Sequence, residues 1–176
     1  LMEIGLFRVF LGVESNAVAG LKALGRGIRR QQNHLALKRL TEAGLHVTFN
    51  LLMFDPESTM ADLAENIAFL RRYATFPLNF GRTEVYSGTA LEKRLRAEGR
   101  LLGDYFGYHY RIAYDRAQRV FELYRRVFLP RCFGEGAMNS EAMRLDYHDH
   151  ILRHFHPECY EPQLGRQAAQ LIAQLN

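Results

Sequence analysis

Polar and charged residues interrupt three apolar segments of this 176-residue chain at places where a ligand could be bound. Glu14 and Ser15 end the first segment, Asn50 lies in the second, and Arg82 and Glu84 lie in the third. An unpaired polar group costs about 2–7 kcal/mol when it is buried, so such residues need partners. Two interpretations stay open. In one, the charged groups face a single mouth and bind a ligand there; in the other, Glu14, Arg82 and Glu84 form a structural ion-pair network.

A second group of potential ligands lies near the C-terminus, where four histidines fall within nine residues. The group consists of His148, His150, His154 and His156, with Asp146, Asp149 and Cys159 nearby. His150 and His154 have the i, i+4 spacing of one helix face, which suits zinc or another transition metal. No HExxH glutamate accompanies them, and a solvated or packing face is the favoured interpretation. No residue is therefore assigned as a metal ligand, and a histidine-cluster metal module stays an alternative.

Three strands must position the polar residues of the first group. Segments rich in β-branched and aromatic residues predict strands buried on both faces at 7–13, 46–54 and 78–86. Equivalent points at Val9, Val47 and Phe80 lie 38 and 33 residues apart, which is the size of the βα repeats that build a parallel sheet. Ligands of such sheets bind where strands end, so Glu14, Asn50, Arg82 and Glu84 are expected at one mouth.

Helical patterns follow each predicted strand. Residues 17–43 predict a short helix, a break at 25–27 and a longer helix that stops at Gly44. A turn at 55–58 leads into a helix that begins with a capping box of Thr59 and Asp62, and another helix spans about 89–98. The predicted buried faces contain Leu35, Leu40 and Ala43 in the first region, and Met60, Leu63, Ile67 and Leu70 in the second.

The pattern changes after residue 113, where only helices are predicted, near 113–130, 138–155 and 163–175. The aromatic residues of the preceding connection are interpreted mainly as packing residues that seat these helices on the sheet, with a substrate-facing wall as the alternative. They are Tyr105, Phe106, Tyr108, Tyr110 and Tyr114.

Composition excludes several classes of protein. With 48% hydrophobic and 24% charged residues and no low-complexity tract, the chain is neither disordered nor collagen-like. Its apolar runs reach four or five residues, far short of the ~18 needed to span a bilayer, and no signal peptide is recognisable, so we expect a cytoplasmic protein without a membrane partner. A net charge of +4 without a basic cluster does not favour a nucleic-acid partner. P-loop, G-x-S-x-G and G-x-G-x-x-G motifs are absent from the sequence.

The predicted sheet is too small to stand alone. Three parallel strands leave two edges unpaired, so further strands are expected from residues before Leu1, from a second copy of the chain, or from another subunit. The chain also opens at Leu1 and enters a strand almost at once, which indicates that it begins inside a domain.

Several motifs together resemble the C-terminal half of a radical S-adenosylmethionine enzyme, most closely the branch with a cobalamin-binding domain. They are Gly12-Val13-Glu14-Ser15, Leu24-Gly25-Arg26-Gly27-Ile28, Ala43-Gly44-Leu45-His46-Val47, the turn Pro56-Glu57-Ser58-Thr59, Tyr86-Ser87-Gly88-Thr89-Ala90-Leu91-Glu92, the stretch 49–56 and the tail 152–157. The resemblance implies an α/β fold: half of a partial (β/α) TIM-like barrel of three parallel βα units at 1–103, followed by an all-helical C-terminal extension at 104–176.

The resemblance also implies a set of cofactor-binding residues. Glu14 and Ser15 would meet the ribose or methionine portion of S-adenosylmethionine, and Arg26 would pair with its carboxylate. The remaining residues assigned to this pocket are Asn50, Leu52, Arg82, Val85 and Tyr86, of which all but Arg82 would lie along the ribose and adenine. Two departures concern backbone shape: Asn16 replaces the usual glycine, and the common Pro-Gly-Glu-Thr turn reads Pro-Glu-Ser-Thr here.

The family's iron–sulfur chemistry needs residues that this chain does not contain. In such enzymes a CxxxCxxC motif binds a 4Fe-4S cluster, and a Gly-Gly-Glu type motif grips the methionine amino group; neither motif occurs here. Cys132 and Cys159 are interpreted as free thiols, so no catalytic residue is assigned, and the isolated chain is not expected to cleave S-adenosylmethionine.

The chain is thus expected to be a C-terminal fragment of a radical S-adenosylmethionine enzyme, contributing cofactor-pocket and substrate-cavity residues to a radical reaction on an unidentified substrate. Its cofactors in the parent enzyme would be S-adenosylmethionine, a 4Fe-4S cluster and, in this branch, cobalamin. Its partner would be the missing N-terminal barrel half, from the same gene or from a partner chain. The alternatives are a non-catalytic half-barrel that self-associates or binds a partner protein, and the histidine-cluster module.

Overall fold

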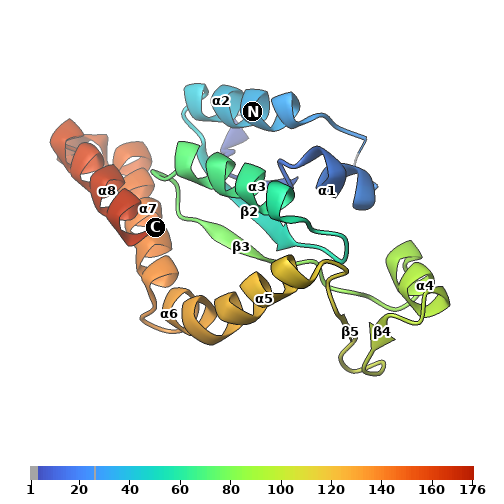
Figure 1. Cartoon of the computed structure of the whole chain (residues 1–176). Coiled ribbons are helices and arrows are strands. Elements are labelled where there is room, and N and C mark those ends of the chain that lie inside the picture. The colour runs from blue at the N-terminus through green and yellow to red at the C-terminus, as the bar shows by residue number, and fades with distance from the viewer. Residues whose placement is uncertain (1–3, 26) are drawn as a thin grey trace.

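A three-stranded parallel sheet with the order β1-β2-β3 forms the centre of the computed structural model, which describes residues 4–25 and 27–176 (Figure 1). The strands are β1 (Arg8–Glu14), β2 (His46–Phe54) and β3 (Asn79–Arg82). Helices α1 (Val18–Ala23) and α2 (Arg30–Glu42) connect β1 to β2, and α3 (Met60–Arg72) connects β2 to β3. The α/β class and the parallel order of the predicted strands are confirmed, and the third strand is shorter than predicted.

The chain leaves the sheet through α4 (Ala90–Ala97) and a small hairpin of β4 (Leu101–Leu102) and β5 (His109–Tyr110). The helical tail then consists of α5 (Asp115–Leu123), the π-helical turn η2 (Tyr124–Phe128), α6 (Leu129–Cys132), α7 (Met138–Phe155), the 3-10 turn η3 (Pro157–Cys159) and α8 (Pro162–Leu175). The helical tail is confirmed, whereas the hairpin was not predicted. The division of the chain at 103/104 stays a prediction.

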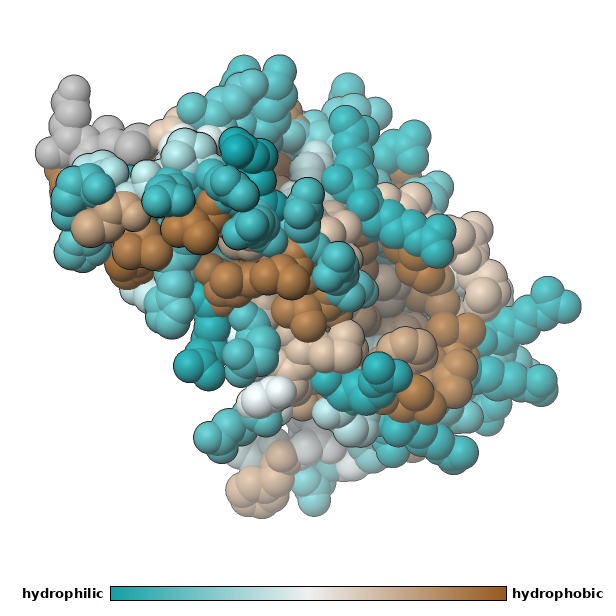
Figure 2. Space-filling view, turned by 90° about the vertical axis from the view of Figure 1, so that its left-hand side faces the viewer, coloured by the Kyte–Doolittle hydropathy of each residue, from teal (hydrophilic) through white to brown (hydrophobic). Residues whose placement is uncertain are grey.

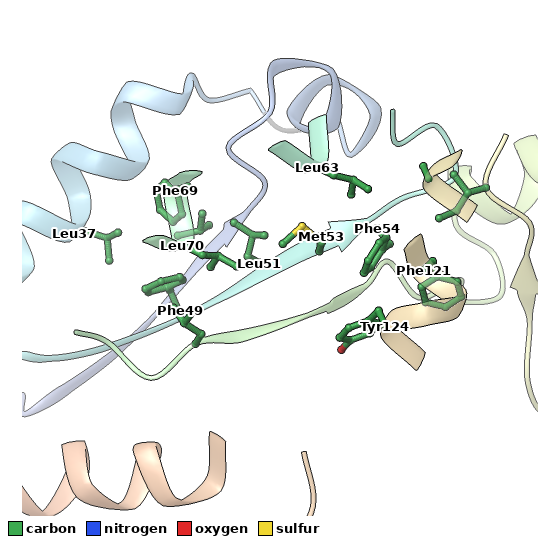
Figure 3. Close-up of a cluster of buried hydrophobic side chains, with 14 of the residues drawn as sticks. Leu37, Phe49, Leu51, Met53, Phe54, Leu63, Phe69, Leu70, Phe121 and Tyr124 are labelled. Atoms are coloured by element: carbon green, nitrogen blue, oxygen red, sulfur yellow. The ribbon is translucent and has the colours of Figure 1, made fainter. Parts of the chain in front are cut away.

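The main core lies between the sheet and helices α2 and α3. Alternate residues of β2, including Phe49 and Leu51, point toward Leu37 of α2 and Phe69 of α3 (Figure 3). On the other face of the sheet, Phe54 meets Phe121 and Tyr124, both at ring-centroid distances of 5.2 Å. β2 is buried on both faces, as its richness in β-branched and aromatic residues predicted.

Local signals for helix ends were accurate. Thr59 accepts a hydrogen bond from the backbone N–H of Asp62, and the Asp62 side chain accepts one from the backbone N–H of Thr59, which is the predicted capping box. Thr89 caps α4 in a similar way, and Gly99 follows that helix with φ +66°.

Predictions of side-chain burial were less accurate. Leu35, Ala43, Met60 and Ile67 are exposed rather than buried, while Leu37 occupies the core position on α2. Of the five connection aromatics, Tyr110 is buried and Tyr108 partly buried, but Tyr105, Phe106 and Tyr114 are exposed. The exposed members therefore do not seat the helical tail on the sheet.

The face of the molecule near α7 and α8 shows apolar patches between hydrophilic side chains (Figure 2).

None of the helices in the described residues is both long and apolar enough to cross a membrane. The longest of them, α7, has 18 residues and carries several charged side chains.

Candidate functional site

A cavity of about 710 Å³ opens at the carboxyl ends of the three parallel strands. Its wall contains Glu14, Asn50, Leu52, Asn79, Phe80, Gly81, Arg82, Thr83, Glu84 and Tyr86 from the strands and the loops after them, and Tyr108, His109, Tyr110, Phe121, Tyr124, Arg125, Leu129 and Phe133 from the later chain. The expectation that Glu14, Asn50, Arg82 and Glu84 face one mouth is thus met by the geometry. A volume of this size accommodates a nucleoside-sized ligand.

Irregular strand pairing shapes the rim of this cavity. The register between β1 and β2 shifts between Gly12 and Glu14, and the register between β2 and β3 shifts between Leu52 and Phe54. Such bulges bend a strand and re-aim its side chains, and they are frequent beside functional sites. Both irregularities lie at the strand ends that carry the polar wall residues.

Glu14 adopts a left-handed backbone conformation with φ 63°, the only positive φ of a non-glycine residue among those described. This conformation costs about 1–2 kcal/mol for an ordinary L-residue, and strain of this kind concentrates at functional sites. The left-handed residue of this turn is thus Glu14, and not Asn16, which stands where the resembled family has a glycine. Asn16 is instead buried, and its backbone is held by hydrogen bonding.

The turn after Glu14 is fixed by two asparagines from different helices. Oδ1 of Asn66 on α3 accepts hydrogen bonds from the backbone N–H of Asn16 at 2.8 Å and of Ala17 at 3.2 Å. Nδ2 of Asn33 on α2 donates to the carbonyl of Ser15 at 3.0 Å. The Ser15 side chain is 1% exposed and belongs to this network rather than to the cavity wall, so its predicted contact with a ligand is not supported by its position.

Arg82 lies between aromatic rings in the cavity wall. Its guanidinium carbon lies 3.6 Å from the ring centroid of Tyr110 and 4.8 Å from that of Phe121, and its Nη2 donates to the Tyr110 carbonyl. Its Nε is buried and has no hydrogen-bond partner. Within the described part of the chain, no ion pair joins Arg82 to Glu14 or Glu84, so the structural ion-pair network is not formed. The charges of this wall are therefore available to a ligand.

Two buried tyrosines make the opposite wall rigid. Burial raises the pKa of the Tyr110 phenol to about 12, so this group stays protonated and donates a hydrogen bond to the Thr83 carbonyl at 2.9 Å. Burial likewise raises the pKa of Tyr124 to about 12, and its hydroxyl donates to the Phe80 carbonyl at 3.1 Å. Both bonds tie the helical tail and the hairpin to β3 and the segment just after it.

Some of the other predicted site residues line the cavity and some do not. Leu52 and Tyr86 line the cavity, and the exposed Tyr86 hydroxyl donates to Glu84. Val85 is buried and is not part of the wall, so only its backbone remains a candidate contact. Arg26 lies outside the described residues. Tyr108 and Tyr110 line the cavity, as the alternative interpretation of the connection aromatics expected, whereas the sequence analysis missed Tyr124 and Arg125 at the start of the tail.

The histidine run divides into one half-buried member, His150, and three exposed ones. His150 approaches Asp146 of the same helix and His46 of β2, and the candidate ligand atoms of these three residues lie within 4.8 Å of one another. His148, His154 and His156 are exposed and do not belong to this group. His154 lies outside this group, and its ring packs against Phe7 at a centroid distance of 5.3 Å, which agrees with the favoured interpretation of a packing face. His46 was missed because it lies 100 residues from Asp146.

Comparisons with known proteins give one partial similarity. The chain is 38% identical over 69 residues to 4'-phospho-dehydrooxetanocin synthase of Priestia megaterium, which covers 39% of this chain and 9% of that protein. No family model matches the chain, and no solved structure matches it. The similar segment is thus a small part of a much longer synthase.

Proposed function

We propose that this chain is the C-terminal part of a radical S-adenosylmethionine enzyme and that the 710 Å³ cavity holds S-adenosylmethionine together with part of the substrate. The observation that carries the proposal is that Glu14, Asn50 and Arg82 line one cavity, Glu14 and Arg82 from the carboxyl ends of β1 and β3 and Asn50 from the middle of β2. That edge is where βα proteins bind their ligands. The partial similarity to a synthase whose name is that of a radical S-adenosylmethionine type enzyme adds support.

Each cavity residue is proposed to contact a different part of the cofactor. The Glu14 carboxylate, which has no hydrogen-bond or ion-pair partner among the described residues, accepts hydrogen bonds from ribose hydroxyls or the methionine amino group. Asn50 and Leu52 lie along the ribose and adenine, and the backbone around Val85 and Tyr86 completes that side. Arg82 offers its unpartnered Nε to an acceptor on the ligand.

The iron–sulfur cluster does not fit the residues of this chain. A site-differentiated 4Fe-4S cluster needs three nearby thiolates, but the sequence has two cysteines, of which Cys132 is half-buried and Cys159 exposed. We propose that an N-terminal barrel half, from the same gene or a partner chain, supplies the cluster and pairs with the outer edge of β1. Cobalamin stays an expectation of the resemblance, because no described feature points to it.

Ligand binding tests the proposed pocket directly. Isothermal titration of the 176-residue chain with S-adenosylmethionine should show binding at about millimolar ligand or below. Glu14→Gln should weaken binding about tenfold through loss of a charge-assisted hydrogen bond, whereas Glu42→Gln on the exposed face of α2 should bind like the unchanged protein. Absence of binding to the folded chain, or equal binding by Glu14→Gln, would contradict the proposal.

The source DNA tests the proposed parent enzyme. Three further βα units of the present size place a CxxxCxxC motif about 80–130 residues upstream of Leu1, in frame. Finding that motif supports the assignment. A stop codon and a separate start site directly upstream would contradict a single-gene enzyme and would leave the partner-chain form of the proposal to be tested by capture of a cysteine-rich partner.

A second candidate function is self-association through the sheet edge. In the described structure β1 pairs only with β2, and Phe10 of β1 is 60% exposed. Exposed apolar edges of this kind pair readily with other strands. Light scattering should show a dimer that Phe10→Lys disrupts if this candidate is correct, and a monomer at all concentrations if it is not.

A further inference from the structure

We infer that His46, Asp146 and His150 form a binding site for one Zn²⁺-like transition-metal ion that joins helix α7 to strand β2. The three side chains come from segments 100 residues apart in sequence, and their candidate ligand atoms lie within 4.8 Å of one another. The inference is independent of the cavity described above, because none of these residues lines it.

The distances between the side chains are close to those of a coordination sphere. Nε2 of His46 lies 2.8 Å from Oδ2 of Asp146, and Nδ1 of His150 lies 3.6 Å from Oδ1 of the same carboxylate. Nδ1 of His150 also donates a hydrogen bond to the backbone carbonyl of Asp146 at 2.9 Å, so the lone pair of the neutral ring is on Nε2. Ligand atoms about 2.0–2.2 Å from a tetrahedral zinc ion are separated by about 3.3 Å. Binding therefore requires that the distance between His46 and Asp146 lengthens. It also requires that His150 either ligates through Nε2 or gives up its hydrogen bond to the Asp146 carbonyl.

Burial of His46 fixes which of its ring nitrogens faces Asp146. Its side chain is 2% exposed, and its Nδ1 is buried without a hydrogen-bond partner. The present bond to Asp146 requires the proton on Nε2, and this leaves the Nδ1 lone pair unpaired. When Nε2 ligates a metal, the proton is on Nδ1, which then needs a hydrogen-bond acceptor. His46 also lines a cavity of about 210 Å³, which is large enough for a water molecule that accepts a hydrogen bond from this N–H group.

Charge and access also suit a dication. The Asp146 carboxylate supplies one negative charge, and Asp149 lines the same 380 Å³ cavity as Asp146 and His150. The cations Arg153 and Arg166 line this cavity as well. That cavity leaves a fourth coordination position open to water. Two imidazoles and one carboxylate select zinc and its transition-metal neighbours rather than magnesium or calcium, which prefer oxygen ligands.

Metal titration of the full chain tests the site. The metal-free protein is titrated with Co²⁺, the absorption of bound Co²⁺ is followed in the visible range, and Zn²⁺ is then added in competition. We expect one equivalent per chain, displaced by Zn²⁺, and a higher Tm in the presence of Zn²⁺. Asp146→Asn retains a hydrogen-bond acceptor for His46 but loses the anionic ligand, so it should weaken binding at least about tenfold. His150→Ala should abolish stoichiometric binding.

The exposed histidines provide the matched control. The double variant His148→Ala/His154→Ala removes two histidines from the same helix but leaves the buried group intact, so it should bind one equivalent like the unchanged protein. Circular dichroism establishes that each variant is folded. Absence of a bound equivalent in the unchanged protein overturns the inference, and so does binding that survives Asp146→Asn and His150→Ala but is lost in the double variant. The latter result would assign the metal to the exposed histidines.

Discussion

Oδ1 of Asn66 on α3 accepts a hydrogen bond from the backbone N–H of Asn16 at 2.8 Å, across 50 residues of sequence. The same oxygen accepts from the backbone N–H of Ala17, so one buried amide satisfies two donors of the turn that follows Glu14. The helix side of the sheet thereby fixes the backbone from which a cavity side chain projects. This coupling between α3 and the rim of the cavity makes the first prediction possible.

Asn66→Ala should destabilise the protein and weaken ligand binding together. Loss of the acceptor leaves the buried N–H of Asn16 unpaired, which costs about 1–3 kcal/mol, whereas the N–H of Ala17 keeps Oγ of Ser15 as an acceptor at 3.2 Å. Urea denaturation measures the loss, and titration with S-adenosylmethionine measures the change in affinity. The control is Glu65→Ala on the same helix, an exposed residue whose 3.7 Å ion pair with Arg30 contributes little. Equal stability of the two variants would show that the turn does not depend on Asn66.

Glu14→Gly should separate backbone strain from ligand contact. Glycine adopts φ near +63° without strain, so this variant should be as stable as the unchanged protein or up to about 1 kcal/mol more stable. It should nevertheless bind S-adenosylmethionine more weakly, because the carboxylate is lost. Thermal denaturation and titration on the same samples give the two readouts. Unchanged binding would remove Glu14 from the proposed pocket.

Local sequence signals predicted the elements well but predicted their contacts poorly. The β-branched and aromatic composition of β2, the capping box of Thr59 and Asp62, and the glycine after α4 depend on neighbours a few residues away. Such features are visible in a single sequence. The exposure of Met60 and Ile67 depends instead on which tertiary elements cover α3, and helical periodicity carries no information on that.

The candidate site was predicted in part for the same reason. Parallel topology brings strand ends together, so Glu14, Asn50 and Arg82 could be placed at one edge from the spacing of the repeats alone. The stacking of Arg82 on Tyr110 and the meeting of His46 with Asp146 depend on how the hairpin and α7 return to the sheet. No local pattern encodes those returns, and they were found only in the folded structure.

Arg82→Lys should weaken the cavity wall although the charge is retained. The guanidinium stacks on Tyr110 at 3.6 Å and contacts Phe121, and an ammonium group cannot reproduce that planar contact. We expect a loss of about 0.5–2 kcal/mol in unfolding free energy and weaker ligand binding. Arg126→Lys in η2, an exposed residue, is the control. Chemical denaturation that gives identical midpoints for the two variants would contradict this role.

Asp55 should make the protein less stable as the pH rises. Burial raises the pKa of its carboxyl group from 3.8 in the folded state, so the unfolded chain loses this proton first when the pH increases. The folded state then holds more protons than the unfolded state, and stability falls from about pH 3.8 up through the folded-state pKa. Asp55→Asn retains an Oδ1 acceptor for the backbone N–H of Glu57 but cannot ionise. Urea denaturation over a pH series should show a smaller decline in stability for this variant, and parallel declines would refute the assignment.

Gly20→Ala should be strongly destabilising because α1 approaches the turn after β1 very closely. A Cβ atom at Gly20 would lie 2.4 Å from Oγ of Ser15, and the Ser15 side chain is buried and cannot move away freely. Overpacking of this kind costs about 1–3 kcal/mol. Gly27→Ala is the matched control, since a Cβ there meets no atom within 4 Å and its φ is not in the left-handed region. Thermal denaturation should give a lower Tm for Gly20→Ala and an unchanged or slightly higher Tm for Gly27→Ala, because alanine reduces the entropy of the unfolded chain. If both variants melt at the same temperature, Ser15 can repack, and the turn is less rigid than its hydrogen bonds indicate.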